Sequence, residues 1–265
     1  MKSLSPEELR ALYDHDQRQN FEEPGVRREV TPFTVRQINT NEPESYLLYS
    51  KLTSENADQI IDDEIAYFES IGHNFEWKLY SHDTPLDLIE RLRRRGFEIN
   101  EPETILVLDM QGLSGILTQP VTHDIRRITD PSVIKSLQDV GATVFGHDLD
   151  GLTERLRWEL THYPDYMNFY GAYVDDVPVA SARINYPTNS QFASLWGGGT
   201  LEAYRGRGIY TALVAARVQE AIQRGRRFLT IDASPMSRPI VERLGFVPIS
   251  ISTPCNWQCK SSTAT

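Results

Sequence analysis

A glycine-rich segment with two arginines precedes a predicted helix, and residues of these types in this order can bind an anion. Three glycines follow the apolar run at residues 192–196, and Arg205-Gly206-Arg207-Gly208 comes shortly after them. The helix predicted from Ile209 to Arg224 leaves its first backbone N–H groups without intrahelical partners, and its dipole places positive charge there. Glycine lets backbone amides close around phosphate oxygens. The segment therefore fits a phosphate group.

The same glycines also fit a plain turn that joins a strand to a buried helix, and the segment alone does not separate the two interpretations. The helix is apolar nearly all round, apart from a predicted polar stripe at Arg217, Glu220 and Arg224. Two common nucleotide-binding loops are excluded. No Lys-Ser or Lys-Thr follows the glycines, and Thr211 stands where a dinucleotide-binding loop has its third glycine.

Two groups of predicted elements surround this segment. In the first group, Ser5-Pro6 with Glu8 predicts a helix start, and an extended segment follows. Periodicity then predicts a helix, a strand, a helix and a strand, at residues 56–71, 75–80, 85–96 and 104–110. Residues 111–120 read as a linker. The second group predicts a strand, two helices, three strands, and then helix, strand, helix and strand, between residues 123 and 252.

The first group looks like a partial copy of the second. Residues 88–99 and 240–249 both run from a helix through Gly-Phe into a strand, and each follows a predicted strand. Turns of this kind are common, so coincidence remains the alternative. The sequence predicts two domains, at residues 1–115 and 120–253.

The segment Arg205-Gly206-Arg207-Gly208-Ile209-Tyr210 resembles the pyrophosphate loop of the GNAT acetyltransferase superfamily. That loop reads Gln or Arg, two variable residues, Gly, one variable residue, and Gly or Ala. The preceding Tyr204, the order of the second group of elements and the closing residues 242–246 (ERLGF) are similar to this family as well. The resemblance covers residues 120–253 and, more weakly, residues 30–110. It implies an α/β (α+β) fold with a mixed central sheet flanked by helices and a degenerate, GNAT-like N-terminal unit.

The resemblance implies a single site for acetyl-CoA as co-substrate, without a metal. The pantetheine arm would pair with the backbone of Gly198, Gly199 and Thr200, where two strands splay apart. Glycine suits a close backbone approach. The pyrophosphate would sit beside Arg205 on the loop amides of Gly206, Arg207, Gly208, Ile209, Tyr210 and Thr211.

The usual catalytic positions of the family hold other residues here. Ser194 stands where many members carry a glutamate base, and Val241 stands where a tyrosine often protonates the leaving thiolate. Ser234 replaces an asparagine in the coenzyme A site. Tyr210 replaces the small residue that ends the loop, so its ring must turn aside. We expect Ser194 to relay a proton through water.

A second candidate base is His147, followed by Asp148, in a loop that borders the acceptor site in this fold. The alternative is that residues 146–151 form a solvated turn that caps the next helix.

Composition restricts the partners. The chain has 37 acidic and 27 basic residues, which argues against general nucleic-acid binding. No apolar run approaches the length of a membrane helix, and the polar N-terminus does not read as a targeting peptide. Cys255 and Cys259 lack further ligands for zinc nearby and read as reduced cysteines. We therefore expect a cytoplasmic protein, and the sequence leaves open whether it is a monomer or a homodimer.

The predicted function is transfer of an acetyl group from acetyl-CoA to a primary amine of a small molecule or peptide. Positioning of the two substrates can supply much of the rate. The substitutions at Ser194 and Val241 leave a second hypothesis, a coenzyme A-binding regulatory protein without turnover. The internal repeat leaves a third, an acyltransferase in small-thiol biosynthesis.

Overall fold

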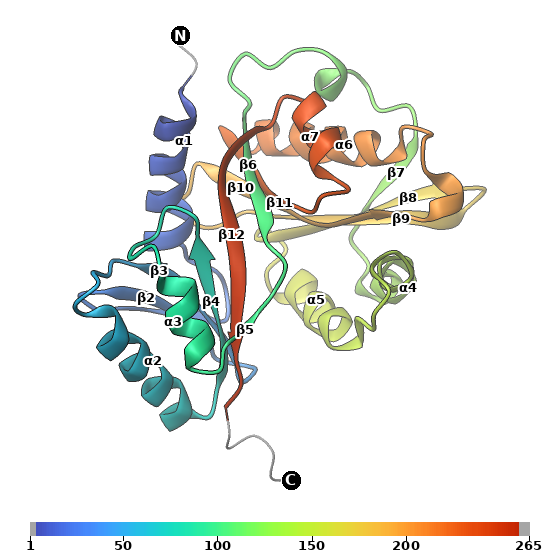
Figure 1. Ribbon diagram of the computed structural model, residues 1–265. Helices are drawn as coiled ribbons and strands as arrows, with labels where there is room; N and C mark the ends of the chain where they lie inside the picture. The colour runs from blue at the N-terminus through green and yellow to red at the C-terminus, as the bar shows by residue number, and fades with distance from the viewer. Residues whose placement is uncertain (1–3, 260–265) are drawn as a thin grey trace. The chain divides into compact units, whose positions relative to one another are not determined.

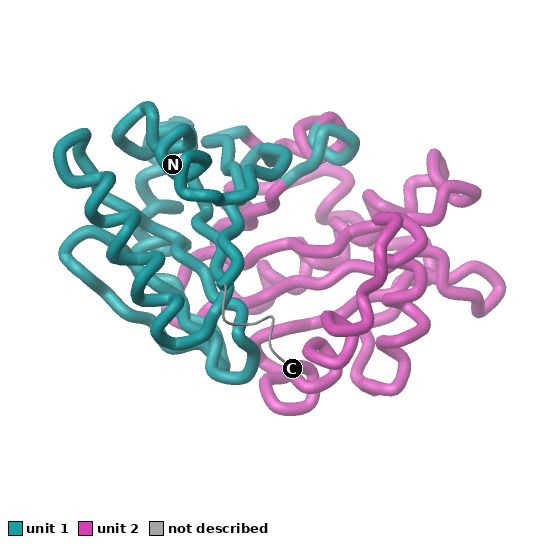
Figure 2. The backbone as a smooth tube through the Cα atoms, turned by 60° about the horizontal axis from the view of Figure 1, so that its bottom comes forward, with its two compact units in different colours: residues 1–106, 233–238, 248–265 teal, residues 107–232, 239–247 magenta. Residues whose placement is uncertain are grey.

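The computed structural model describes residues 4–259, and the chain divides into two compact units (Figure 2). Unit 1 comprises Met1–Leu106, Ala233–Arg238 and Pro248–Thr265, and unit 2 comprises Val107–Asp232 and Pro239–Val247. Residues 248–253, which the sequence assigned to the second domain, thus group with the N-terminal residues. The reason is strand pairing, because these residues belong to a strand of the unit 1 sheet.

Unit 1 begins with α1 (Pro6–Tyr13), which has the predicted capping box: Ser5 N donates to Glu8 Oε2 and Glu8 N donates to Ser5 Oγ. The helical path continues as a π-helical segment, η1 (Asp14–Gln19). The other helices are α2 (Ala57–Ile71) and α3 (Leu88–Arg94). The strands are β1 (Val26–Val30), β2 (Thr34–Asn39), β3 (Glu44–Ser50), β4 (Asn74–Tyr80), β5 (Glu98–Ile99), the first part of β6 (Glu103–Asp109), and β12 (Val247–Trp257).

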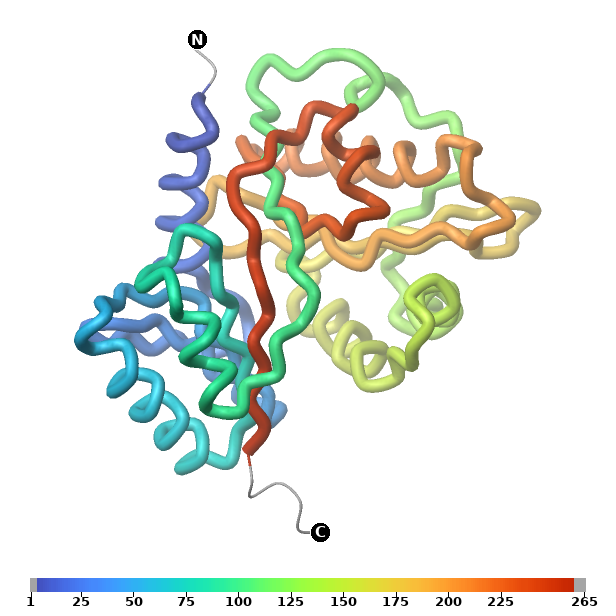
Figure 3. Tube along the Cα trace, viewed as in Figure 1, coloured from blue at the N-terminus to red at the C-terminus, as the bar shows by residue number. Residues whose placement is uncertain are grey.

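The sheet of unit 1 places the C-terminal strand beside β4. Its order is β1-β2-β3-β4-β12, with β5 also on β12; β3 and β4 run parallel, and the pairs β1–β2, β2–β3, β4–β12 and β5–β12 are antiparallel. In Figure 3 the red C-terminal segment can be followed into this position. Helices α2 and α3 cover one face (Figure 1). The core between them contains Ile61, Phe68, Leu92, Trp77 and Trp257, each at most 5% exposed.

The sequence-based prediction for the first unit was incomplete. The helices at α2 and α3 and the strands at β4 and β6 are confirmed, but β2 and β3 were missed. In residues 34–39 (TVRQIN) the two apolar residues stand three apart, and in residues 44–50 (ESYLLYS) the apolar and aromatic residues form one continuous run, so neither segment has a clear period of two. Tertiary packing decides their conformation.

Unit 2 is a mixed sheet with helices on both faces. Its strands are β7 (Asp124–Ile128), β8 (Met167–Val174), β9 (Val177–Asn185), β10 (Phe192–Thr200) and β11 (Phe228–Ala233), in the order β11-β10-β9-β8-β7. Its helices and short turns are η2 (Ile116–Thr118), η3 (Pro131–Val133), α4 (Ile134–Phe145), α5 (Asp150–His162), η4 (Glu202–Tyr204), α6 (Ile209–Gln223) and α7 (Arg238–Arg243). Figure 1 shows α4 and α5 on one face and α6 on the other.

The predicted linker is an ordered part of unit 2. Leu117 is 2% exposed, and the side chain of Gln219 on α6 donates to Leu117 O and to Gln119 O. Residues 116–119 therefore pack on α6.

Candidate active site

Strand β10 leaves its neighbours at the predicted glycines. The parallel ladder with β11 ends at Leu195 and Ile231, although β10 runs on to Thr200. The antiparallel ladder with β9 has a bulge between Trp196 and Gly199, where Gly197 has a φ of +57°. Beyond Leu195 the backbone of β10 therefore no longer pairs with β11, so the two strands separate at the glycines, as predicted.

The loop that follows exposes the start of α6. Gly208 is the N-cap residue, and its carbonyl accepts from Ala212 N at 2.9 Å. Gly206 and Gly208 have φ values of +73° and +79°, which favour glycine. The N–H groups of Ile209, Tyr210 and Thr211 have no intrahelical acceptor because they form the first turn. Since residues 205–208 are exposed, these donors and the helix dipole are open to an anion.

The two loop arginines are held by local carbonyl groups. Arg205 Nε donates to Thr200 O at 3.1 Å, which ties the loop to the end of β10. Arg207 Nη2 donates to Ala203 O at 3.0 Å, and its guanidinium lies 5.1 Å from the ring centre of Tyr204. Their charges thus stay beside the loop.

His123 is a loop residue that the sequence analysis missed. Its Nε2 donates to Arg207 O at 2.9 Å, and its ring faces Gly208. Eighty-odd residues of chain separate the two, and a single histidine before a strand gives no signal of such a contact. His123 also lines a pocket of about 330 Å³ on the flank of α6. The other lining residues are Val121, Ile125, Arg127, Tyr170, Ala216, Gln219, Glu220 and Gln223.

Glycines on β10 admit close neighbours from two helices. A Cβ at Gly199 would meet Val144 of α4 at 2.9 Å, so no side chain fits there. A Cβ at Gly198 would meet the ring of Tyr210 at 3.2 Å. The ring of Tyr210 thus turns toward the sheet, and burial raises the pKa of its hydroxyl.

The catalytic candidates lie in different environments. Ser194 is buried in β10, between Asn185 of β9 and Thr230 of β11. His147 is exposed after α4, where its Nδ1 lies 3.1 Å from Asp148 O. Asp148 Oδ1 accepts from Asp150 N at 2.8 Å in a local turn before α5, whose N-cap residue is Leu149. The catalytic role of His147 stays a prediction.

Two further predicted positions can be placed. Val241 is fully buried in α7. Ser234 follows β11 in the segment that belongs to unit 1, where its Oγ lies 3.3 Å from Ser237 Oγ. Its role in cofactor binding stays a prediction.

Comparison with known proteins identifies the domain built around this loop. Residues 136–246 match the family described as the acetyltransferase (GNAT) family. The chain contains a GNAT acetyltransferase domain. No protein among curated sequences matches the chain.

Solved structures extend the likeness of fold beyond the GNAT domain. A conserved protein of unknown function from Staphylococcus epidermidis is 15% identical, with a TM-score of 0.69 over 95% of this chain and 99% of that chain. A GCN5-related N-acetyltransferase from Kribbella flavida is 15% identical, with a TM-score of 0.64 over 88% and 89%. A tandem GNAT protein from the clavulanic acid biosynthesis pathway is 11% identical, with a TM-score of 0.58 over 90% and 85%. The shared fold therefore includes most of unit 1.

Unit 1 contains a strand pair that resembles β10 and β11 of the GNAT domain. Strands β3 and β4 are parallel and joined by α2, as β10 and β11 are parallel and joined by α6. The ladder between β3 and β4 ends at Leu47 and Trp77, although β3 runs to Ser50 and β4 to Tyr80. These strands therefore separate in the same way.

In unit 1 the gap between the separating strands is filled by a buried ion pair. Arg18 Nε donates to Leu48 O of β3 at 3.0 Å, and Tyr80 N of β4 donates to Asp83 Oδ2 at 2.9 Å. Arg18 Nη2 donates to both Asp83 oxygens, at 2.7 and 2.9 Å. The side chains are 1% and 4% exposed. Removal of either partner would leave an unpaired buried charge, at a cost of about 3–5 kcal/mol. The two side chains therefore stay paired and keep the gap between β3 and β4 filled.

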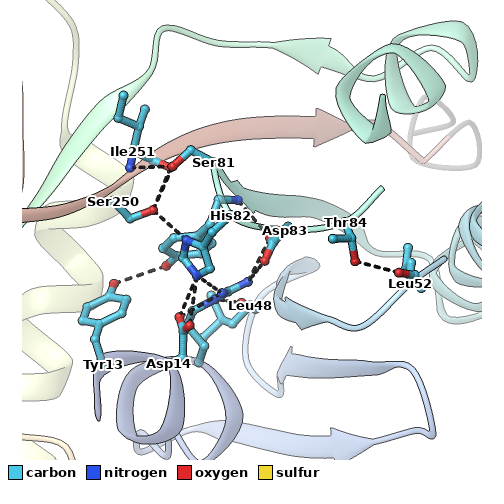
Figure 4. Close-up of polar contacts among 12 residues, drawn as sticks. Tyr13, Asp14, Leu48, Leu52, Ser81, His82, Asp83, Thr84, Ser250 and Ile251 are labelled. Carbon is cyan, nitrogen blue, oxygen red and sulfur yellow. Dashed lines mark hydrogen bonds and ion pairs between the residues drawn. The ribbon is translucent and has the colours of Figure 1, made fainter. Parts of the chain in front are cut away.

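A chain of polar contacts surrounds the pair (Figure 4). Asp14 accepts from Arg18 Nη1 at 2.9 Å and from His82 Nε2 at 2.9 Å, and His82 Nδ1 lies 2.9 Å from Ser250 Oγ. Burial raises the pKa of Asp14, but the hydrogen bond from His82 and the charge of Arg18 outweigh it and leave this pKa lowered. The cluster thus links η1 to β12.

Other classes of site are not found within residues 4–259. No three His, Cys, Asp or Glu residues there lie close enough together to hold a metal ion, and no helix has the length and apolarity needed to span a bilayer. Both cysteines are buried and neither is in a disulfide within these residues, and burial raises the pKa of Cys255 to about 12.

Proposed function

We propose that the GNAT domain transfers an acetyl group from acetyl-CoA to a primary amine of a small molecule or peptide. The observation that carries the proposal is the separation of β10 from β11 next to the glycine loop and the first turn of α6. An extended chain that carries a pyrophosphate, such as coenzyme A, matches both parts. We also place the protein in the cytoplasm, where buried thiols such as those of Cys255 and Cys259 stay reduced.

The residues present suit this co-substrate. The amides of residues 206–211 and the helix dipole would hold the pyrophosphate. The backbone of residues 198–200 would pair with the amides of the pantetheine arm in the manner of an added strand. Acetyl-CoA supplies an activated acetyl group, so the protein has to hold that group beside the amine.

Transfer then depends on positioning and on removal of a proton from the amine. A backbone N–H at the β10 bulge would stabilise negative charge on the thioester oxygen. Ser194 would hold a water molecule that accepts the proton of the amine, and His147 would serve if the acceptor enters beside the end of α4. Orientation of the two reactants would supply much of the rate.

Acetyl-CoA should stabilise the protein. At one hundred times its Kd, a ligand that binds only the folded state adds about 2.7 kcal/mol, which raises the Tm of a chain of this size by about 5–10 °C. Thermal unfolding with and without the ligand measures the shift. Adenosine at the same concentration is the control and should give none, because it lacks the pyrophosphate and the pantetheine arm. An unchanged Tm with millimolar acetyl-CoA would refute the proposal.

The intact chain should bind one acetyl-CoA. Residues 51–56, which join β3 to α2, contain no glycine, and Arg18 with Asp83 occupies the gap between β3 and β4. Isothermal titration calorimetry should therefore give a stoichiometry near one per chain. A value near two would show that unit 1 keeps a working site.

Release of free coenzyme A in the presence of a panel of amines tests the reaction itself. Turnover with at least one amine is the expected result. Tight binding without turnover on any amine would favour the non-catalytic hypothesis.

A further inference from the structure

Arg217 is buried in the face of α6 that packs on the sheet. The sequence pattern predicted it as part of a polar stripe, but the residue is only 1% exposed. It lies two turns after the start of α6 at Ile209. A fully buried arginine is rare and is normally paired, so its partners decide what it does.

The guanidinium of Arg217 has no anionic partner. Nε donates to Leu213 O at 3.0 Å and Nη1 donates to Arg183 O at 3.1 Å, whereas Nη2 is buried without any hydrogen-bond partner. The carboxylate of Glu220 lies one turn away but pairs with Arg224 at 3.0 Å and Arg127 at 3.9 Å. Within the described residues, Arg217 forms no ion pair. A buried charge of this kind is costly to the fold, so it calls for an explanation.

The unpartnered nitrogen lies beneath the β10 bulge. A Cβ at Gly198 would be 3.7 Å from Arg217 Nη2, and only the ring of Tyr210 would be nearer. Arg183, whose carbonyl holds Nη1, is the register partner of Trp196 at the start of the bulge. Arg217 is thus anchored on β9, and its Nη2 lies next to Gly198, in the part of β10 that would hold the end of the pantetheine arm.

We propose that Arg217 provides the fixed positive charge that stabilises the departing coenzyme A thiolate. This inference rests on the proposed function. In the transfer step the amine nitrogen forms a bond to the thioester carbonyl carbon, and the bond from that carbon to sulfur breaks. The sulfur leaves with the electron pair, the amine proton passes to water, and the thiolate takes a proton from solvent after release. Val241 has no proton to give, and a fixed positive charge beside the sulfur would favour its departure as an anion.

The pKa of the thiol of bound coenzyme A measures the effect of the Arg217 charge. A neighbouring arginine lowers the pKa of a thiol by a unit or more, and thiolate formation is followed by its absorbance in the near ultraviolet. The titratable groups that face Arg217 are Tyr210 of α6, Tyr170 of β8 and Tyr186 after β9. Burial raises the pKa of each of these tyrosines, so they stay neutral while the thiol titrates.

Three variants distinguish an effect of the Arg217 charge on the thiol from an effect of the Arg217 side chain on the stability of the fold. Arg217→Met removes the charge and keeps an apolar side chain of similar length, Arg217→Lys keeps the charge, and Arg224→Met removes a paired arginine from the same helix. With coenzyme A bound to the wild-type protein and to each variant, the thiol is titrated between pH 5 and pH 10, and Tm is measured alongside.

In the wild-type protein the bound thiol should titrate at least one pH unit below free coenzyme A. Arg217→Met should remove this difference, keep or raise the Tm, and lower kcat at least 100-fold with little change in KM. Arg217→Lys should retain part of the difference, and Arg224→Met should retain all of it.

A bound wild-type thiol that titrates like the free one overturns the inference, even where Arg217→Met does not fold. A lower Tm with an unchanged thiol pKa in Arg217→Met assigns the residue to structure alone. Failure of the wild-type protein to bind coenzyme A would instead refute the proposed function.

Discussion

Gly206→Val should weaken acetyl-CoA binding at least 100-fold. In the structure nothing lies within 4 Å of the position of a Cβ at Gly206, so the branched side chain would project into the space in front of the loop. It would also force a residue with a Cβ into a φ of +73°, a conformation that β-branched residues avoid. Both effects move the amides of residues 206–211 away from the pyrophosphate.

Gly225→Val is the matched control for this experiment. Gly225 also has a φ of +73° with nothing within 4 Å, but it follows the C-terminal end of α6. Backbone strain should therefore lower the stability of both variants by a similar amount, whereas only the loop variant should lose the ligand. Gly208→Val is a poorer choice, because a Cβ there would also lie 3.5 Å from the ring of His123.

Calorimetry with acetyl-CoA, together with thermal unfolding of both variants, decides the outcome. If Gly206→Val binds acetyl-CoA as tightly as Gly225→Val, the loop is only a connection between β10 and α6. If both variants lose the ligand, the loss comes from stability and not from the loop.

The sequence was most informative where the backbone needs a particular residue type. Gly206 and Gly208 were assigned to a turn that opens a helix, and both occupy positive φ there. Ser5 was assigned as a helix cap and forms the predicted capping box. The GNAT family and its fold class were also recognised from the loop and the order of elements. Such features are local in the chain, so the residues that require each conformation stand next to one another.

Features that depend on contacts across the fold were not predictable. Arg217 was predicted as part of a polar stripe together with Glu220 and Arg224, because only the packing of α6 shows which of its residues are buried. The contact of His123 with the loop joins residues far apart in the chain. Arg18 and Asp83 lie in unremarkable polar segments, and only the separation of β3 from β4 shows that they fill a gap. Strands β2 and β3 were missed for the same reason, since their conformation follows from their neighbours in the sheet.

Removal of residues 1–115 should leave a chain that does not stay soluble. Strand β12 would remain, but its partners would be gone, because Ser252–Trp257 pair with Tyr80–Phe75 of β4 and Cys255 and Asn256 pair with β5. Cys255 and Trp257 are at most 5% exposed in the intact protein, where they pack with Phe75 in the core of unit 1. The fragment would expose them on an unpaired strand, which is a template for aggregation.

The same deletion damages unit 2 directly. Residues 107–109 of β6 belong to that unit, and Val107 and Leu108 are buried there. Asp109 forms an ion pair with Arg227 at 3.0 Å, and Met110 N donates to Arg227 O at 2.8 Å. The GNAT domain therefore loses part of its own core when the chain starts after residue 115.

Expression of residues 116–265 alone should give aggregated protein, and co-expression of residues 1–115 as a separate chain should restore part of the soluble yield. A soluble fragment that binds acetyl-CoA as the intact chain does would refute this, because it would mean that the GNAT domain folds without unit 1.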